Sequence, residues 1–204
     1  FYAGSVASRS LVNGPVARAD LRRIYRYFKK YKAREISKII SASPKIATEP
    51  VAPAYFAVGH TDLAADITGM TGFIPVEKYA DSEKALPGEI GKVEQFRFVL
   101  SPLFEPWLMA GVAGTNYLSN GVKPSSSSPA DVYPLICVAA DAYAIVPLAG
   151  KNAVKPMVLN PGKPSTSDPL GQIGFVSWKT YQAYAILNQS WIARLEVAAT
   201  ASPT

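Results

Sequence analysis

The sequence has little of the chemistry on which most enzymes depend. Its 204 residues include one cysteine, Cys137, and one histidine, His60. A single cysteine excludes an intrachain disulfide, and one Cys with one His cannot complete a tetrahedral zinc site. Cys137 lies in the apolar run "VYPLICVAADAYAIVPL", so we expect a buried thiol whose pKa is raised and whose thiolate is suppressed. We expect His60 to cap or support local structure rather than to transfer protons.

Charged residues and long apolar runs are also scarce. Only 18% of the residues are charged, whereas 49% are apolar. This composition is typical of a globular chain of one large or two small domains, with more apolar surface than a monomer needs, and it favours assembly. The sequence has neither an apolar run of membrane-spanning length nor the order of a signal peptide. We therefore expect a soluble chain with no membrane partner.

Glycine-rich cradles for phosphate are missing as well. The segment 87–99, "PGEIGKVEQFRFV", places only two residues between Gly88 and Gly91, and Val93 follows Lys92. A P-loop needs four residues between its glycines and a Ser or Thr after the Lys. "MAGVAGTN" lacks the six-residue dinucleotide fingerprint. We expect no cofactor.

Carboxylates lie where they cap backbone N–H groups rather than where they would form a catalytic pair. The densest group, among helix-start and turn signals, is Asp62, Asp66, Asp81, Glu83 and Glu89. The expectation is a protein that is not an enzyme. A hydrolase that uses Cys137 or these carboxylates is the weakest of the alternatives.

What the sequence does contain is an amphipathic segment at 16–40. At 100° per residue, its apolar side chains fall within about 120° of arc: Leu21, Ile24, Tyr25, Phe28, Ile36 and Ile39. Prolines follow at 44 and 50 and disfavour helix at and before their own positions. The pattern predicts one long helix over 16–40.

The opposite face of that predicted helix is basic. It consists of Arg22, Arg23, Arg26, Lys29, Lys30, Arg34 and Lys38. Residues 16–40 hold nine Lys or Arg against two acids, a charge of 9 − 2 = +7, which leaves +6 − 7 = −1 for the rest of the chain. Two interpretations stay open: a solvated helix face, or a surface that contacts a polyanion.

Short strands and loops are predicted elsewhere. Residues 1–15 show no lasting period and are interpreted as a connection, and 114–131 is a polar loop rich in Gly, Pro and Ser. Strands are predicted at 52–60, 94–100, 132–140 and within 151–169, with two more in 172–187 and 191–200 joined around "NQS". Partial helix in the last two segments stays an alternative.

Three blocks of sequence, in order, resemble a known family. They are "HTDLAADITGMTGFIPVEKYADSEKALPGEIGKVEQFRFV" (60–99), "VYPLICVAADAYAIVPLAG" (132–150) and "DPLGQIGFVSWKTYQAYAILNQSWIARLEV" (168–197). They resemble the major capsid proteins of N4-type tailed phages, which have the HK97-like capsid fold. The resemblance implies an α+β fold with a long spine helix and with mixed or antiparallel sheets in peripheral and axial domains. The corresponding parts are 1–15 (N-terminal connection), 16–103 (spine helix and peripheral-domain-like part), 104–165 (axial-domain-like part) and 166–204 (C-terminal strands).

The resemblance also assigns roles to particular residues. The family's "GEIG" turn, which leads into a strand with Phe96 and Arg97, is matched by Gly88, Glu89, Ile90 and Gly91. Packing positions of the C-terminal block are matched by Trp178, Lys179 and Trp191. Ile173 stands where the family commonly has an Arg, which puts an intersubunit ion pair there in doubt. The sequence before residue 16 is too short for the fold's N-terminal arm and extended loop, so we expect an intact subunit heavier than 21.9 kDa.

The resemblance implies a structural function. We expect a major capsid protein of a tailed double-stranded DNA phage that is assembled in the host cytoplasm, forms hexamers and pentamers of an icosahedral shell, and is located in the virion. Its partners would be further copies of itself and packaged DNA, bound without sequence preference through the basic face, with scaffold, portal or cement proteins as further candidates. The alternative is a nucleic-acid-binding module that uses the helix 16–40.

Overall fold

The computed structural model describes residues 1–41, 47–79, 85–114, 116–121, 128–147, 154–162, 164, 166–180 and 182–201. The chain is mixed α/β and divides into two compact units. Unit 1 comprises Phe1–Ala142 and Asn188–Thr204, and unit 2 comprises Tyr143–Leu187. The expected boundaries after residues 103 and 165 do not coincide with these units, and the peripheral and axial assignments stay predictions.

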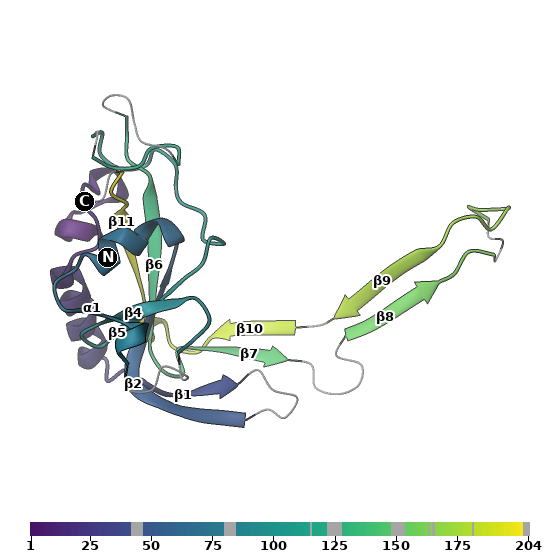
Figure 1. Cartoon of the computed structure of the whole chain (residues 1–204), viewed down its shortest axis with the longest axis horizontal. Coiled ribbons are helices and arrows are strands. Elements are labelled where there is room, and N and C mark those ends of the chain that lie inside the picture. The colour runs from purple at the N-terminus through teal and green to yellow at the C-terminus, as the bar shows by residue number, and fades with distance from the viewer. Residues whose placement is uncertain are drawn as a thin grey trace. The chain divides into compact units, whose positions relative to one another are not determined.

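Unit 1 is built on a seven-stranded mixed sheet (Figure 1). Its strands are β1 (Ile36–Ser41), β2 (Ala47–Gly59), β3 (Phe73–Pro75), β4 (Glu89–Val93), β5 (Phe96–Leu100), β6 (Val132–Val138) and β11 (Ile192–Ala198). The order is β11-β6-β2-β5-β4-β3, and β1 pairs with β2 off this path. Only β2 and β5 run parallel among the pairs described. The strands predicted at 52–60, 94–100 and 132–140 are confirmed.

The predicted long helix is wrong in its second half. Helix α1 spans Arg18–Lys30, 13 residues, and ends in a Schellman motif. The Ala33 N–H donates to the Phe28 carbonyl oxygen (2.9 Å) and the Lys32 N–H to the Lys29 carbonyl oxygen (3.1 Å). Lys32 holds the left-handed conformation, with φ of +54°, that this motif requires. No long spine helix is therefore present at 16–40, and the chain continues into β1.

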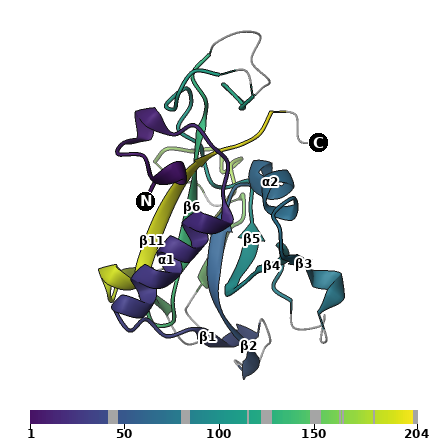
Figure 2. The ribbon, with the colours of Figure 1, turned by 90° about the vertical axis from the view of Figure 1, so that its left-hand side faces the viewer.

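The apolar face of α1 is as the sequence predicts up to Phe28. Leu21, Ile24 and Phe28 are fully buried, and each contributes about 2 kcal/mol through removal of apolar surface from water. Figure 2 shows α1 lying along one face of the sheet beside β6 and β11. Tyr25, also on α1, is partly buried against the core, whereas the last two predicted members of this stripe, Ile36 and Ile39, lie in β1 instead.

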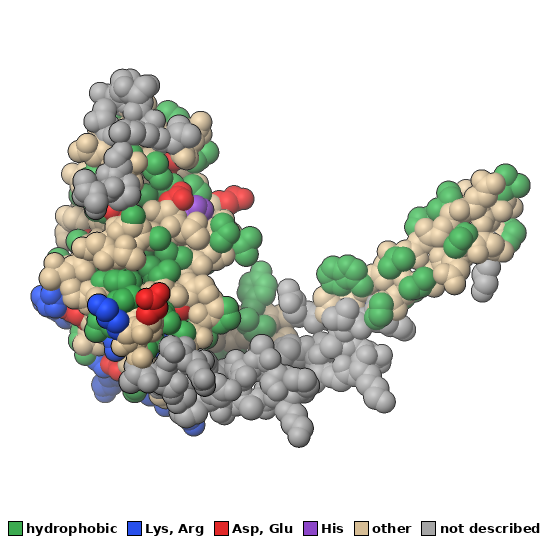
Figure 3. Space-filling model, in the orientation of Figure 1, with side chains coloured by type: hydrophobic (Ala, Val, Ile, Leu, Met, Phe, Trp, Pro, Cys, Tyr) green, Lys and Arg blue, Asp and Glu red, His purple; other side chains and the backbone are tan. Residues whose placement is uncertain are grey.

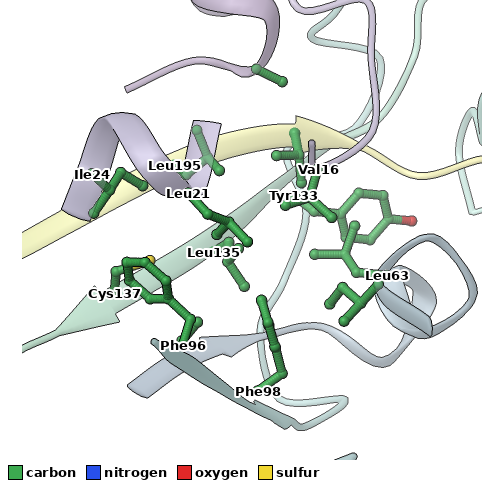
Figure 4. Packing of buried hydrophobic residues seen from close by; sticks show 14 of the residues in the cluster. Val16, Leu21, Ile24, Leu63, Phe96, Phe98, Tyr133, Leu135, Cys137 and Leu195 are labelled. Carbon is green, nitrogen blue, oxygen red and sulfur yellow. The ribbon is translucent and has the colours of Figure 1, made fainter. Parts of the chain in front are cut away.

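The sheet meets α1 with a layer of alternating side chains. The pairing of neighbouring strands puts Ala193, Cys137 and Ala57 in one row and Leu195 opposite Leu135 in the next. Figure 4 shows Leu135, Leu195 and Cys137 of the sheet on the side of Leu21 and Ile24 of α1, with Phe96 and Phe98 of β5 beside them. Because successive side chains of a strand point to opposite faces of the sheet, these small and large residues share the face that packs against α1.

Short helical turns complete unit 1. They are η1 (Ala3–Ser5), η2 (Arg9–Leu11), η3 (Thr61–Leu63), α2 (Ala64–Thr68), η4 (Val76–Lys78) and η6 (Gln189–Trp191). The N-terminal connection is anchored, because Ala3 and Val12 are buried in the core. The polar loop predicted at 114–131 is described except for residues 115 and 122–127. Its end, Asp131, is buried and accepts the N–H groups of Met109 (2.8 Å), Asn120 (2.9 Å) and Gly121 (2.7 Å).

Unit 2 consists of two antiparallel two-stranded ribbons. β7 (Tyr143–Pro147) pairs with β10 (Gln182–Ile186), and β8 (Val154–Leu159) pairs with β9 (Phe175–Thr180). The strand predicted within 151–169 is confirmed. The segment 172–187, predicted as one strand, contains two, β9 and β10, and its helical alternative is wrong. The expected C-terminal part, 166–204, contains strands of both units: β9 and β10 belong to unit 2, and β11 belongs to unit 1.

Candidate functional site

The predicted basic face does not lie on one helix. Five of its seven members are on α1, whereas Arg34 follows the helix and Lys38 lies in β1. Figure 3 shows Lys and Arg side chains gathered at the edge where Figure 1 draws α1, with carboxylates among them. The surface is therefore less uniformly positive than the sequence of 16–40 indicates.

One acid comes from the turn between β4 and β5. Glu94 accepts hydrogen bonds from Arg22 Nε at 2.8 Å and from Arg18 Nε at 2.5 Å. These two guanidinium groups, Arg22 first, hold the pKa of the Glu94 carboxyl below its usual value. Arg22 is thus partly neutralised by a residue 72 positions away in the chain.

Three further cations of the basic face also have acidic partners. Lys29 Nζ donates to Glu35 Oε1 at 2.7 Å, and this bond raises the pKa of Lys29. Arg34 Nη2 pairs with Asp141 Oδ2 at 2.6 Å. Arg23 Nη2 lies 3.2 Å from a carboxylate oxygen of Asp20 and also donates to the Tyr2 carbonyl oxygen.

The other three cations of the basic face have no acidic partner among the described residues. Arg26, Lys30 and Lys38 are exposed, and within the described parts of the chain none of them forms an ion pair with an acid. We call these three residues the unpaired basic group. They hold the charge that is available to an anionic partner in this part of the chain.

The second predicted site, the "GEIG" segment, is a structural element. Gly88 lies in a turn at φ of +78°, where a side chain is strained. Glu89, Ile90 and Gly91 already belong to β4, so the turn is shorter than the motif suggests. Gly91 is required for close packing, because a Cβ there would lie 2.5 Å from the Ile74 carbonyl oxygen.

Glu89 is the centre of a buried polar network. Its Oε1 accepts from Arg97 Nε (2.6 Å) and from the Tyr79 hydroxyl (2.9 Å), and its Oε2 accepts from Arg97 Nη2 (2.5 Å) and from the Leu86 N–H (3.0 Å). Burial alone would lower the pKa of Arg97, but the bidentate contact with Glu89 outweighs it and raises that pKa. The network fixes β4, β5 and the segment before them.

The residues considered for catalysis have structural roles wherever the structure describes them, and Asp81 and Glu83 lie outside the described residues. His60 Nδ1 accepts the Asp62 N–H at 3.1 Å and caps η3, which confirms the predicted capping role. Cys137 is fully buried, and burial raises the pKa of its thiol to about 12, as predicted. The described residues include no cluster of three or more His, Cys, Asp or Glu side chains suited to a metal ion. No helix among them has the length and apolarity to cross a membrane.

The matched aromatic positions behave differently from each other. Trp191 packs against the core, and its Nε1 donates to the Tyr31 carbonyl oxygen at 3.0 Å, so its predicted packing role is confirmed. Trp178 is exposed, so the packing role predicted for it is wrong within this chain. Its neighbour Lys179 is also exposed. Sequence reasoning missed the surface around Trp178, although Val176 and Trp178 stand at alternate positions and mark one apolar face of the strand.

The chain is similar to a phage structural protein. It is 32% identical over 146 residues to the major capsid protein of Pseudomonas phage KPP21, and the match covers 66% of this chain and 34% of that protein. The chain thus spans about a third of the length of this curated relative. No protein-family model matches the chain. The similarity supports the resemblance to phage major capsid proteins, and the N4-type assignment stays a prediction.

Proposed function

We propose that this chain is part of the major capsid protein of a tailed double-stranded DNA phage. In this role it is structural rather than enzymatic, belongs to the virion and assembles with copies of itself into hexamers and pentamers of an icosahedral shell. The observation that carries the proposal is the 32% identity over 146 residues to a phage major capsid protein. The N4-type family and the HK97-like fold belong to the same proposal, without a long spine helix at 16–40.

The chemistry of the chain supports a structural role. Its titratable groups form ion pairs and caps that fix strands and turns, as Glu89 does for β4 and β5. Large apolar side chains stand exposed in both units, including Leu103 in unit 1 and Tyr184 in unit 2. Exposed apolar surface of this kind marks contacts with other molecules, and a closed shell consists of such contacts repeated between identical subunits.

The proposal is tested on particles of the phage that encodes the sequence. Peptide mass spectrometry of purified virions should assign peptides of this chain to the most abundant virion protein. Portal and tail proteins, which occur in few copies, provide the internal scale. Absence of these peptides from the particles, or their presence at the level of a minor component, contradicts the proposal.

The unpaired basic group supports a second, dependent proposal. In a shell, Arg26, Lys30 and Lys38 would face the packaged DNA and contact its phosphates without sequence preference. If all three meet phosphate, the slope of log K against log salt is about −0.9 × 3, near −3. If the chain is instead a nucleic-acid-binding module, an isolated chain should show the same slope. The salt dependence therefore does not distinguish the two functions, and the formation of shells does.

Charge removal tests the DNA contact. The double variant Arg26→Gln, Lys30→Gln should reduce the salt slope by about 2, because each lost phosphate contact removes about one unit. The control, Lys78→Gln with Lys92→Gln, removes the same charge from η4 and β4. Equal effects of the two double variants on DNA retention by assembled shells would refute a specific role for the basic group.

A further inference from the structure

The chain contains the dipeptide Asn–Gly twice, as Asn13–Gly14 and as Asn120–Gly121. An asparagine before glycine is chemically labile, because glycine has no side chain to shield its main-chain nitrogen from the neighbouring amide carbon. Both asparagines are exposed to water. The local sequence therefore makes the two pairs similarly reactive, and only the fold distinguishes them.

The second pair is held in a turn by Asp131. Asn120 and Gly121 lie at φ of +51° and +75°, the positive values that a tight turn with Asn–Gly at its centre requires. The Gly121 N–H donates to Asp131 Oδ2 at 2.7 Å, and the Asn120 N–H donates to Asp131 Oδ1 at 2.9 Å. Asp131 is fully buried, and hydrogen bonds to a carboxylate are strong. The nitrogen that would attack the Asn120 side chain is thus already bound.

The first pair lacks this restraint. Asn13–Gly14 lies in the connection between η2 and α1, and neither residue has the positive φ of the turn. Among the hydrogen bonds of the described residues, none is donated by the Gly14 N–H. The Gly14 nitrogen therefore lies beside the exposed side chain of Asn13 without a competing acceptor.

We propose that Asn13 is a site of spontaneous deamidation in the folded chain, and that Asp131 protects Asn120 from the same reaction. The Gly14 nitrogen attacks Asn13 Cγ and forms the N–Cγ bond of a cyclic imide. Its proton passes through water to the leaving nitrogen, the Cγ–Nδ2 bond breaks, and ammonia departs. Water then opens the imide at Cγ, which gives aspartate, or at the main-chain carbonyl carbon, which gives isoaspartate. The sum consumes one water molecule, releases one ammonia molecule and needs no oxidant or cofactor.

Modification at Asn13 disturbs the anchor of the N-terminal connection, which Figure 2 shows beside β11. The Val12 carbonyl oxygen accepts the Val112 N–H (3.0 Å), and the Gly14 carbonyl oxygen accepts the Ala198 N–H (2.9 Å). Val12 is also fully buried. Isoaspartate adds a carbon to the main chain between these two fixed points, so the hydrogen bonds and the burial cannot all be kept. The modified chain should be less stable than the fresh one.

Incubation of the 204-residue chain near pH 8, followed by peptide mass spectrometry, measures both pairs in one sample. Trypsin releases Asn13 in the peptide 10–18, "SLVNGPVAR", and a second protease supplies a peptide that contains Asn120. In the native chain, Asn13 should deamidate at least about tenfold faster than Asn120, because a hydrogen bond to a charged group keeps the open form of the turn rare. In guanidinium chloride the two rates should agree within about threefold, because unfolding removes the turn.

Two variants separate the causes. Asn13→Gln should abolish the modification of peptide 10–18 and leave the rate at Asn120 unchanged, because glutamine must close a larger ring. Asp131→Ala removes both acceptor oxygens and should raise the rate at Asn120 by about tenfold without changing that at Asn13. If Asp131→Ala does not fold, the comparison of the wild-type chain with and without guanidinium chloride tests the same protection.

The melting temperature tests the structural consequence. An aged wild-type chain should melt below the fresh chain, whereas Asn13→Gln aged for the same time should not. Native rates at both pairs as high as in guanidinium chloride refute protection by Asp131. Native rates at both pairs far below those in guanidinium chloride refute Asn13 as a modification site. A fully modified chain with the melting temperature of the fresh chain refutes the disturbed anchor. None of these results depends on the proposed capsid function.

Discussion

Removal of the Glu89 carboxylate should be among the most destabilising single changes in unit 1. The side chains of Glu89 and Arg97 are 0% and 6% exposed, so Glu89→Ala removes the only charge-neutralising carboxylate that the ion pairs described here give to this buried guanidinium group. Such a loss costs about 3–5 kcal/mol. The Leu86 N–H and the Tyr79 hydroxyl also lose their acceptor. We expect a decrease of about 4 kcal/mol in the free energy of unfolding, a large part of the 5–15 kcal/mol typical of a domain.

Urea unfolding followed by far-UV circular dichroism measures this decrease. Glu77→Ala, the same chemical change at an exposed position of η4, should cost less than about 0.5 kcal/mol. The double variant Glu89→Leu, Arg97→Met should be more stable than Glu89→Ala, because it removes both charges of the buried ion pair instead of one. A Glu89→Ala variant within about 1 kcal/mol of the wild type would show that the network does not support β4 and β5 as described.

Three further changes probe the core and its charges. The Cys137 thiol, buried and with its pKa raised to about 12, should stay unmodified by a disulfide reagent near pH 8 until urea unfolds the chain; rapid reaction of the native chain would contradict this. Because Arg22 lowers the pKa of Glu94 in the folded state, their pair stabilises the fold above the ordinary pKa of 4.5 and loses this effect as the pH falls below it. Glu94→Gln should therefore lower the melting temperature near pH 6 and leave it unchanged near pH 2, and an equal decrease at both would be inconsistent with this origin. Gly91→Ala should cost about 1–3 kcal/mol, since its Cβ would lie 2.5 Å from the Ile74 carbonyl oxygen; an unchanged melting temperature would show that the contact relaxes freely.

The strands of the core could be predicted because their burial follows their sequence. β6 is apolar along its whole length, and Phe96 and Phe98 alternate with Arg97 in β5. The helix end could not be predicted from periodicity, since Ile36 and Ile39 continue the helical stripe. The Schellman motif has Lys32 where glycine is usual, so its sequence signal is absent.

The charge of the basic face could not be predicted from local sequence. Its acidic partners Glu94 and Asp141 lie 72 and 107 residues away from Arg22 and Arg34, and only the folded sheet brings them together. The exposed ribbons of unit 2 were missed for a different reason. Apolar strands indicate burial, but the sequence does not say whether another part of the same chain or another molecule provides it.

Electron microscopy of the intact subunit, expressed alone and together with any scaffold protein encoded beside it, tests the central claim most directly. If the chain is part of a phage major capsid protein, the images should show closed shells of uniform diameter in which this chain is the repeated subunit. Particles of this kind should sediment far ahead of a monomer. Only monomers or small oligomers under both conditions would contradict the account.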